Sequence, residues 1–270
     1  MTESNLRFGF GDNWRDFSTL VDQKRLDSAT ERLVNFLGNR DLSGLSFADI
    51  GCGSGLHSVA AEKLGAKAIW AIDLDIESVE TTRDVAKFFG TARITVEQAD
   101  ILTLRTDLAG TFDVVYSWGV LHHTGNMFAA LDQTAKLVKP GGYLAVALYG
   151  KTRYCELWKK IKRKYCRGGA KLKKKYEDRY IWAFGLYLLL RGQTLSKKKR
   201  EYVQKRGMNF EHDVKDWLGG YPYESLTADQ LRGHLGEEFD LISSNTRKRS
   251  GLFGSGCDEY LLRKTSDGSI

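Results

Sequence analysis

The chain has 270 residues, of which 42% are hydrophobic, and this is enough to bury the core of one large domain. Its first residues lack the apolar core of a secretory signal, and its longest apolar run, residues 181–190, is too short to cross a membrane. These features argue against a secreted or membrane-spanning protein, so we expect a cytoplasmic location.

The net charge of +7 is spread unevenly along the chain. Residues 151–206 hold 20 of the 41 Lys and Arg residues but only four acids, which gives this segment +16 and leaves −9 for the rest. Such an asymmetry concerns partners and solubility, not the fold. The four cysteines are scattered without metal-ligand spacing, so we expect reduced thiols and no metal site.

Residues 27–150 alternate between short apolar runs and amphipathic helical runs. The runs predict strands at 46–50, 68–72, 93–97, 112–116 and 143–148, and helices at 56–64, 76–89 and 128–138. We expect Pro140-Gly-Gly142 to stop the last of these helices. Such repeats favour an α/β fold with a parallel sheet and right-handed crossovers.

Two further strands are predicted near the end, at 238–243 and 258–263, on either side of a glycine-rich loop. They could form a hairpin that closes one edge of the sheet. Composition divides the chain into residues 1–26, 27–150, 151–206 and 207–270. As domains we expect an N-terminal arm or lid (1–26), an α/β core (27–150), a basic helical insertion with the segment that follows it (151–223), and the rest of the core sheet (224–270).

The strongest motif is Asp49-Ile-Gly51-Cys-Gly53-Ser-Gly55, where a strand enters a glycine turn and then a helix. Glycines let the backbone approach a ligand closely, and the free N–H groups of the turn favour anionic groups. A dinucleotide fold would need the spacing G-x-G-x-x-G, and an acid at Asp49 would repel a pyrophosphate. Asp49 instead suits a ligand with a cationic amino acid end, which argues against an NAD-dependent oxidoreductase.

Acidic residues follow the next two strands. Asp73 ends the second strand and could accept both hydroxyls of a ribose. Asp75 is the alternative, although its place before a helix also suits an N-cap. After the third strand, Asp100 could accept a hydrogen bond from a purine amine while Ile101 covers the ring face.

The segment from Phe112 to Gly125 leaves the fourth strand and contains Ser117, Trp118, His122 and His123. Together with the glycine turn, the strand-end acids and the closure at 137–142, it resembles the class I S-adenosylmethionine-dependent methyltransferases. The resemblance is greatest to the group that includes ubiquinone and menaquinone biosynthesis methyltransferases, and it covers about residues 45–150.

This resemblance implies S-adenosylmethionine as cofactor and a Rossmann-like sheet ordered 3-2-1-4-5-7-6 with strand 7 antiparallel. It also implies that the insertion at 151–223 takes part in substrate recognition. It implies that Gly51, Gly53 and Gly55 lie under the methionine moiety and that Asp49 helps to hold the amino end. Asp73 would then bind the ribose, and Asp100 with Ile101 the adenine. Ser117 and Trp118 would line the floor near the sulfonium.

Methyl transfer requires a nucleophile aimed at the methyl carbon, and orientation alone can supply about 7–11 kcal/mol. A hydroxyl or amine acceptor must also lose a proton, and His122 or His123 could serve as the base. The alternative is that these histidines only pack against, or cap, the start of a helix.

Two segments outside the shared core are candidates for the acceptor side. Residues 8–14, which include Trp14, could fold over the cofactor as a lid or simply pack as an arm. Residues 208–223 are dense in polar and aromatic groups, which is typical of a pocket wall but also of a surface turn anchored by aromatics. The candidate substrate-binding residues in this second segment are His212, Trp217, Tyr221 and Tyr223.

The basic segment 151–206 has three interpretations: a solvated helical face, a nucleic-acid site, or a face that contacts a membrane surface. Nucleic acid is the less favoured partner, because the chain has only two prolines and lacks the proline-containing motifs of base methyltransferases. The leading hypothesis is a methyltransferase that acts on a small-molecule or lipid-like acceptor, with oxygen as the acceptor atom. An RNA methyltransferase and a non-catalytic cofactor-binding scaffold are the alternatives.

Overall fold

The computed structural model describes residues 21–104, 110–206, 210–246, 252–253 and 256–266. Its centre is a seven-stranded sheet with the order β3-β2-β1-β4-β5-β7-β6. The strands β1 to β5 pair in parallel, and β7 runs antiparallel to both β5 and β6. The predicted α/β fold, strand order and antiparallel strand 7 are therefore confirmed. The strands are β1 (Ser46–Ile50), β2 (Ala68–Asp73), β3 (Ile94–Gln98), β4 (Phe112–Trp118), β5 (Val138–Tyr149), β6 (Phe239–Asn245) and β7 (Cys257–Lys264).

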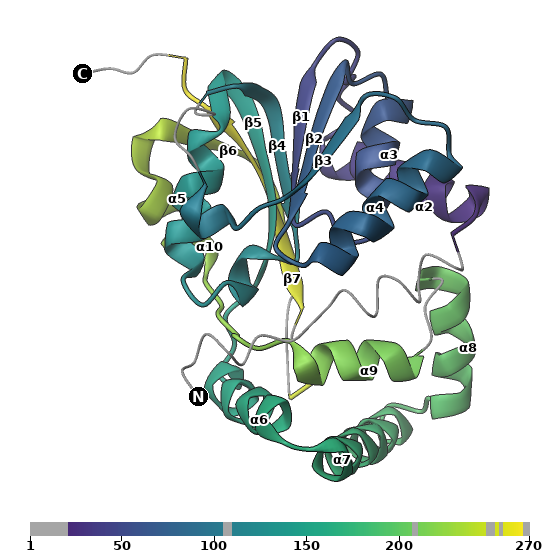
Figure 1. The fold of residues 1–270 in the computed structure, drawn as a ribbon. Helices are drawn as coiled ribbons and strands as arrows, with labels where there is room; N and C mark the ends of the chain where they lie inside the picture. Colours follow the sequence, from purple (N-terminus) through teal and green to yellow (C-terminus); the bar gives the residue numbers. More distant parts are fainter. Residues whose placement is uncertain (1–20, 105–109, 207–209, 247–251, 254–255, 267–270) are drawn as a thin grey trace.

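Helices cover both faces of this sheet (Figure 1). One face carries α2 (Gln23–Phe36), α3 (Leu56–Lys63) and α4 (Ile76–Phe88), and the other carries α5 (Met127–Lys136) and α10 (Ala228–Leu235). All five residues of β1 are buried, as expected for a central parallel strand between two helical layers. The edge strand β6 buries only Phe239, so the core lies under the middle of the sheet.

Local capping groups fix where several helices begin. The Asp22 carboxylate accepts the N–H of Arg25 at the start of α2, and Asp75 accepts that of Glu77 at the start of α4. Asp75 is thus the helix cap that its position in the sequence allows.

The segment around Pro140 differs from the prediction. The helix α5 ends at Lys136, and β5 already begins at Val138 and runs through Pro140-Gly-Gly142. The pairing of β4 with β5 is irregular opposite this point, between Phe112 and Val114. A Cβ on Gly142 would lie 2.9 Å from the carbonyl oxygen of Asp113, so glycine lets the strands approach there. The Pro-Gly-Gly signal therefore marks a strand irregularity and not the helix end.

Four helices follow β5 and form a layer below the end of the sheet at which β5 stops (Figure 1). They are α6 (Cys155–Arg167), α7 (Ala170–Leu189), α8 (Leu195–Arg206) and α9 (Phe210–Gly219). Their packed side chains form a hydrophobic cluster of their own, which includes Trp158, Tyr165, Val214 and Leu218. The chain then returns to the sheet through the cis peptide between Tyr221 and Pro222. Among the described residues, no helix has the length and apolar character needed to span a bilayer.

Candidate functional site

The glycine turn after β1 is held in a conformation that only glycine adopts easily. Gly51, Gly53 and Gly55 have φ angles of 79°, 55° and 73°. A Cβ on Gly51 would lie 2.4 Å from the side chain of Val120, and one on Gly55 would lie 2.7 Å from Thr82. The turn therefore packs closely against both the loop after β4 and the helix α4.

Asp49 lies in β1, just before this turn. The residue is only 2% exposed, and its carboxylate accepts a hydrogen bond of 2.6 Å from the Ser58 hydroxyl. Burial, with a smaller contribution from the negative charge of Asp73, raises the pKa of Asp49 to about 7. A cationic group placed beside Asp49 would favour its ionised form, which is the property the sequence motif indicated.

Asp73 at the end of β2 joins two of the strand-end loops. One carboxylate oxygen accepts the N–H of Gly53 and the other accepts that of Asp75, both at 3.0 Å. Burial nevertheless raises the pKa of Asp73 above its usual value. The backbone carbonyl of Asp73 also accepts the N–H of Ala99, 3.0 Å away, which brings the loop after β3 alongside.

The loop after β3 contains the remaining predicted cofactor residues. The Asp100 carboxylate accepts the N–H of Leu102 and caps the short helix η2 (Ile101–Thr103). Ile101 is buried in the core on the α5 face of the sheet. The structure thus brings Asp49, the glycine turn, Asp73 and Asp100 to one edge of the sheet. Their contacts with a cofactor stay a prediction.

The two residues at the end of β4 point in different directions. The Ser117 hydroxyl is completely buried and donates to the carbonyl of Ile50, 2.9 Å away, so it joins β4 to β1. Trp118 is 43% exposed, and its indole N–H donates to the carboxylate of Glu259 at 3.1 Å.

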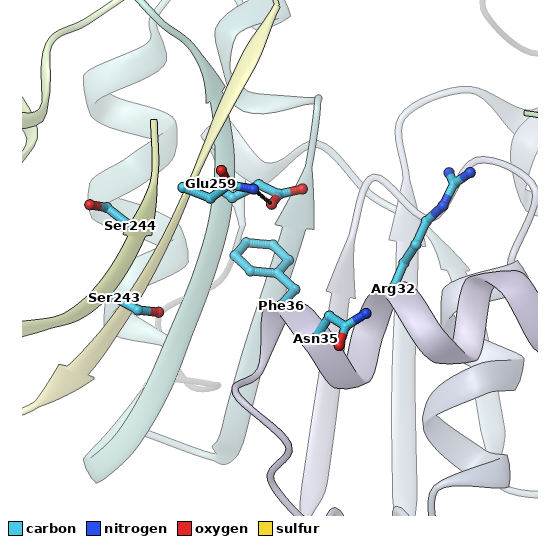
Figure 2. A pocket seen from close by; sticks show the side chains of 7 residues that line it. Arg32, Asn35, Phe36, Ser243, Ser244 and Glu259 are labelled. Atoms are coloured by element: carbon cyan, nitrogen blue, oxygen red, sulfur yellow. Dashed lines mark hydrogen bonds between the residues drawn. The ribbon is translucent and has the colours of Figure 1, made fainter. Parts of the chain in front are cut away.

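Glu259 also lines a cavity of about 250 Å³ between α2 and the β6–β7 hairpin. Figure 2 shows Phe36 and Asn35 at the end of α2, with Glu259 and Ser243 on the strand side. Sequence reasoning missed this cavity, because its walls come from the two ends of the chain. The residues that line it are Arg32, Asn35, Phe36, Ser243, Ser244, Asn245 and Glu259.

The two candidate bases lie in the short helix η4 (Leu121–His123), just after β4. His122 is completely buried; its Nδ1 accepts the N–H of Tyr149 at 3.3 Å, and its Nε2 has no hydrogen-bond partner within the described part of the chain. The Nδ1 of His123 lies 2.7 Å from the carbonyl oxygen of Pro222. Since a carbonyl oxygen only accepts, Nδ1 of His123 carries the proton and Nε2 carries the lone pair.

Both histidines are neutral at physiological pH. Burial, together with a smaller contribution from the positive charge of Lys162, lowers the pKa of His122 well below its usual value and that of His123 to about 3. The imidazole of His122 also packs against the Tyr149 ring, with ring centres 3.8 Å apart and planes tilted by 35°. The structure thus holds both rings in fixed positions as weakly basic, uncharged groups.

Lys162 is a buried cation that sequence reasoning missed. It comes from α6, and its ammonium lies 3.8 Å from the centre of the Trp217 ring and 5.2 Å from that of Tyr223. It donates a hydrogen bond to the backbone carbonyl of Trp217. Burial lowers its pKa to about 7.

The predicted acceptor-side residues have different surroundings. Tyr221 and Tyr223 are buried, at 4% and 2% exposure, and Tyr223 belongs to the core of the helical layer. Trp217 is half-buried against Tyr149 and Trp158. His212 lies in α9, but its side chain is outside the described residues, as is all of Trp14. A role of these residues in acceptor binding stays a prediction.

The described residues contain no group of three or more His, Cys, Asp or Glu side chains that could hold a metal ion.

A family model described as a methyltransferase domain matches residues 41–218. The chain is 32% identical to the ubiquinone biosynthesis O-methyltransferase of Xanthomonas oryzae over 128 residues, which cover 47% of this chain and 50% of that protein. It is 38% identical to the enzyme of the same name from Caulobacter vibrioides, over 40% of this chain and 42% of that one. A ribosomal protein methyltransferase of Photobacterium profundum is 34% identical to this chain, and the match covers 44% of this chain and 38% of that protein. The chain thus spans about half the length of the curated relatives it matches, or less.

Solved structures of low sequence identity share the fold. The magnesium protoporphyrin IX methyltransferase of Synechocystis, solved with bound SAH, is 20% identical with a TM-score of 0.51, over 90% of this chain and 83% of that one. A protein from work on the conversion of a disulfide bond into a thioacetal group in echinomycin biosynthesis is 18% identical, with a TM-score of 0.52. This match covers 88% of this chain and 83% of that protein's chain.

Proposed function

The chain belongs to the methyltransferase-domain family, whose fold takes S-adenosylmethionine as the methyl donor, and we propose that it methylates a hydroxyl oxygen of a small or medium-sized molecule. The observation that carries this proposal is the contact between the glycine turn and the histidine loop. The position of a Cβ on Gly51 lies 2.4 Å from Val120, which immediately precedes η4 with His122 and His123. A donor seated on the turn would therefore lie beside these two rings.

The chemistry of the residues at the glycine turn fits this donor. Asp49, a buried carboxyl with a raised pKa, would hold the cationic amino end. The N–H groups of Gly51, Cys52, Gly53 and Gly55, which the sequence motif suggested for an anionic group, instead donate to Ile72, Asp73 and Cys52 within the protein. Asp73 would accept the ribose hydroxyls, and Asp100 with Ile101 would bind the adenine. When bound, the donor supplies a methyl group already activated on a sulfonium. The protein's own task is to orient an acceptor and keep water away.

The protonation state of His123 limits what it can do for the acceptor. With a pKa of about 3, its Nε2 is unprotonated at neutral pH and can accept a hydrogen bond from a hydroxyl group. It is too weak a base to take the proton completely before the methyl group moves. We therefore assign His123 to orienting the acceptor, and we attribute most of the acceleration to proximity, which reaches about 7–11 kcal/mol. His122, which packs against the Tyr149 ring and accepts the backbone N–H of Tyr149, would keep His123 in place.

The proposal of an oxygen acceptor also draws on the relatives, since several are named as ubiquinone biosynthesis O-methyltransferases. The aromatic residues that α9 and the following segment place near η4 would suit an apolar, lipid-like acceptor. On the acceptor side we propose Trp217, Tyr221 and Tyr223, together with Trp14 and His212 from outside the described side chains.

The first experiment is a calorimetric titration with S-adenosylhomocysteine, with NAD as the control ligand. We expect the wild type to bind S-adenosylhomocysteine and not NAD, and Asp73→Ala to lose most of this affinity. Labelled S-adenosylmethionine is then offered with a panel of phenols, aliphatic alcohols and amines. A methyl ether product supports the proposal, and a methylated amine as the only product contradicts the oxygen acceptor.

The net charge of +16 on residues 151–206 supports an RNA acceptor as a second candidate. RNA methylation would appear as transfer of label to RNA with salt-sensitive retention. Cofactor binding without transfer to any class of acceptor would instead indicate a scaffold that binds the cofactor without catalysis.

A further inference from the structure

The outward face of α7 changes character halfway along its length. Its first half exposes cations at helical spacing, Lys171, Lys175 and Arg179. Its second half continues the same face with apolar side chains, which are Trp182 (72% exposed), Leu186 (45%), Leu189 (63%) and Leu190 (82%). Figure 1 shows α7 as the outermost helix of the lower layer, on the side away from the sheet.

These apolar side chains are not needed for the packing of the helical layer. The inward face of α7 packs through Tyr176, Tyr180, Ile181 and Phe184 against its hydrophobic cluster. The four exposed side chains belong to none of the clusters that the described residues form. Of the eleven large apolar side chains exposed in the described chain, six lie between residues 157 and 190. Single exposed apolar residues are ordinary, but a contiguous group indicates a contact surface.

The charge around this apolar tip selects the kind of partner. Beyond the end of α7, Arg191, Lys197 and Arg200 are also exposed. Residues 151–206 contain only four acids, and two of them interact within this segment. Glu177 accepts a hydrogen bond from the Tyr165 hydroxyl, and Asp178 forms an ion pair with Lys174. The surface therefore has exposed apolar side chains at its centre and Lys and Arg side chains around them. Such a surface is complementary to a partner with an anionic surface and an apolar interior.

We propose that the outward face of α7 docks onto the surface of an anionic phospholipid bilayer. Trp182, Leu186, Leu189 and Leu190 enter the boundary between headgroups and acyl chains, while the surrounding Lys and Arg side chains meet the anionic headgroups. Tryptophan is favoured at this depth because its ring is apolar and its N–H is polar. The inference rests on the surface of α7 and of the residues that follow it, and it does not depend on the acceptor proposed above.

Two other partners fit this surface less well. RNA would use the cations and stack its bases on aromatic rings, but three of the four apolar side chains are leucines, which offer no π-face. A second copy of the chain would bring two strongly cationic segments together, and their repulsion opposes a symmetric contact.

Sedimentation with phospholipid vesicles tests the proposal. The wild type is mixed with vesicles of phosphatidylcholine alone and with vesicles that also contain phosphatidylglycerol. We expect binding only to the anionic vesicles, weaker at high salt because headgroup attraction is screened. The triple variant Trp182→Ser, Leu189→Ser, Leu190→Ser should bind them roughly tenfold or more weakly, because it loses most of the apolar contact. Phe88→Ser, which removes an equally exposed ring (68%) from α4, is the matched control and should bind like the wild type.

Unchanged binding of S-adenosylhomocysteine by the triple variant shows that it is folded. Absence of wild-type binding to anionic vesicles overturns the proposal, and so does equal binding by the triple variant. RNA binding that is lost in the triple variant, without any vesicle binding, assigns the surface to nucleic acid. A wild-type dimer that the triple variant dissociates, again without vesicle binding, assigns it to self-association.

Discussion

The ammonium of Lys162 lies 3.8 Å from the centre of the Trp217 ring, and Lys162 is completely buried. This contact joins α6 to α9, and the backbone carbonyl of Trp217 accepts a hydrogen bond from the same ammonium. Three aromatic faces, those of Trp217, Tyr223 and Tyr149, surround the charge and partly replace its lost hydration. Lys162 therefore anchors the helical layer beside η4. Burial of its charge lowers the free energy of unfolding by an amount that depends on pH.

Stability should rise with pH because of Lys162. Its pKa is about 7 in the folded protein against 10.5 ordinarily, so the unfolded chain binds more protons between these values. The free energy of unfolding should therefore increase by about 1–3 kcal/mol between pH 7 and 9.5, since one pKa unit corresponds to about 1.4 kcal/mol. Urea denaturation at the two pH values measures the change. Lys162→Met should remove this increase, whereas Lys160→Met, at an exposed position of the same helix, should keep it.

Replacing His123 should lower the rate without weakening donor binding. His123→Ala removes the group assigned to orient the acceptor, so we expect kcat to fall by roughly tenfold or more and the affinity for S-adenosylhomocysteine to stay unchanged. With the donor saturating, His123 should contribute no step in kcat near pH 6.5, because its pKa is about 3. A pH profile from 5.5 to 8 and a calorimetric titration measure the two properties. A wild-type rate that rises through pH 6.5, and loses this rise in His123→Ala, would contradict the assignment.

Binding of the donor should release protons because of Asp49. In the free protein its pKa is about 7, so near pH 6.5 most of the protein carries a proton on this carboxyl. The cationic amino group of the ligand favours the ionised form, and the proton should leave on binding. Titrations of S-adenosylhomocysteine in buffers of different ionisation enthalpy measure the release. We expect the wild type to release protons on binding at pH 6.5 and to release few at pH 8.5. Asp49→Asn should lack the release that comes from the Asp49 carboxyl.

Asp49→Asn should also stabilise the free protein at alkaline pH. A folded pKa raised above the unfolded value of 3.8 means that stability is lost as pH rises through about 7. The asparagine cannot ionise, so the free energy of unfolding of Asp49→Asn should exceed that of the wild type at pH 8.5, and the excess should become smaller as the pH falls from about 7 towards the unfolded pKa of 3.8. Asp41→Asn, on an exposed carboxyl, is the control. Equal stability of Asp49→Asn and the wild type at pH 8.5 would show that Asp49 is not buried as an unpaired charge.

The sequence predicted those parts of the site that depend on short stretches of chain. The glycine turn was recognisable because Gly51, Gly53 and Gly55 all adopt positive φ, a requirement that the residue type itself reveals. Asp73 was recognisable because it ends a strand at a fixed distance from that turn. The sheet order followed from the resemblance of a whole set of motifs, not from any one of them.

Long-range contacts were not predictable in this way. Trp118 bonds to Glu259 across 141 positions, and nothing local to either residue indicates the other. Lys162 stood among many lysines of a basic segment, where a solvated side chain is the ordinary expectation. Its spacing from Trp158 and Tyr165, which are both buried on α6, was the one available signal that it faces inward. Pro140 was misread because the strand irregularity that accommodates it depends on the neighbouring strand.

The contact between Gly51 and Val120 should couple donor binding to the histidine loop. Gly51→Ala would bring a Cβ to 2.4 Å from the Val120 side chain, in addition to the cost of a positive φ. Gly44→Ala isolates that second cost, because Gly44 has a similar φ of 74° and nothing within 4 Å of its Cβ position. We expect Gly44→Ala to lower the free energy of unfolding by about 1 kcal/mol and Gly51→Ala by about 2–4 kcal/mol.

The double variant Gly51→Ala, Val120→Ala distinguishes a clash with the loop from damage to the turn alone. Removing the Val120 methyl groups should restore roughly half of the stability that Gly51→Ala loses, and the shortfall from additivity measures their coupling. If the turn also positions η4, the double variant should recover methyl transfer along with stability. If the changes in the free energy of unfolding caused by the two substitutions are strictly additive, the turn and the loop do not act together. A donor bound at the turn would then not directly affect the positions of His122 and His123.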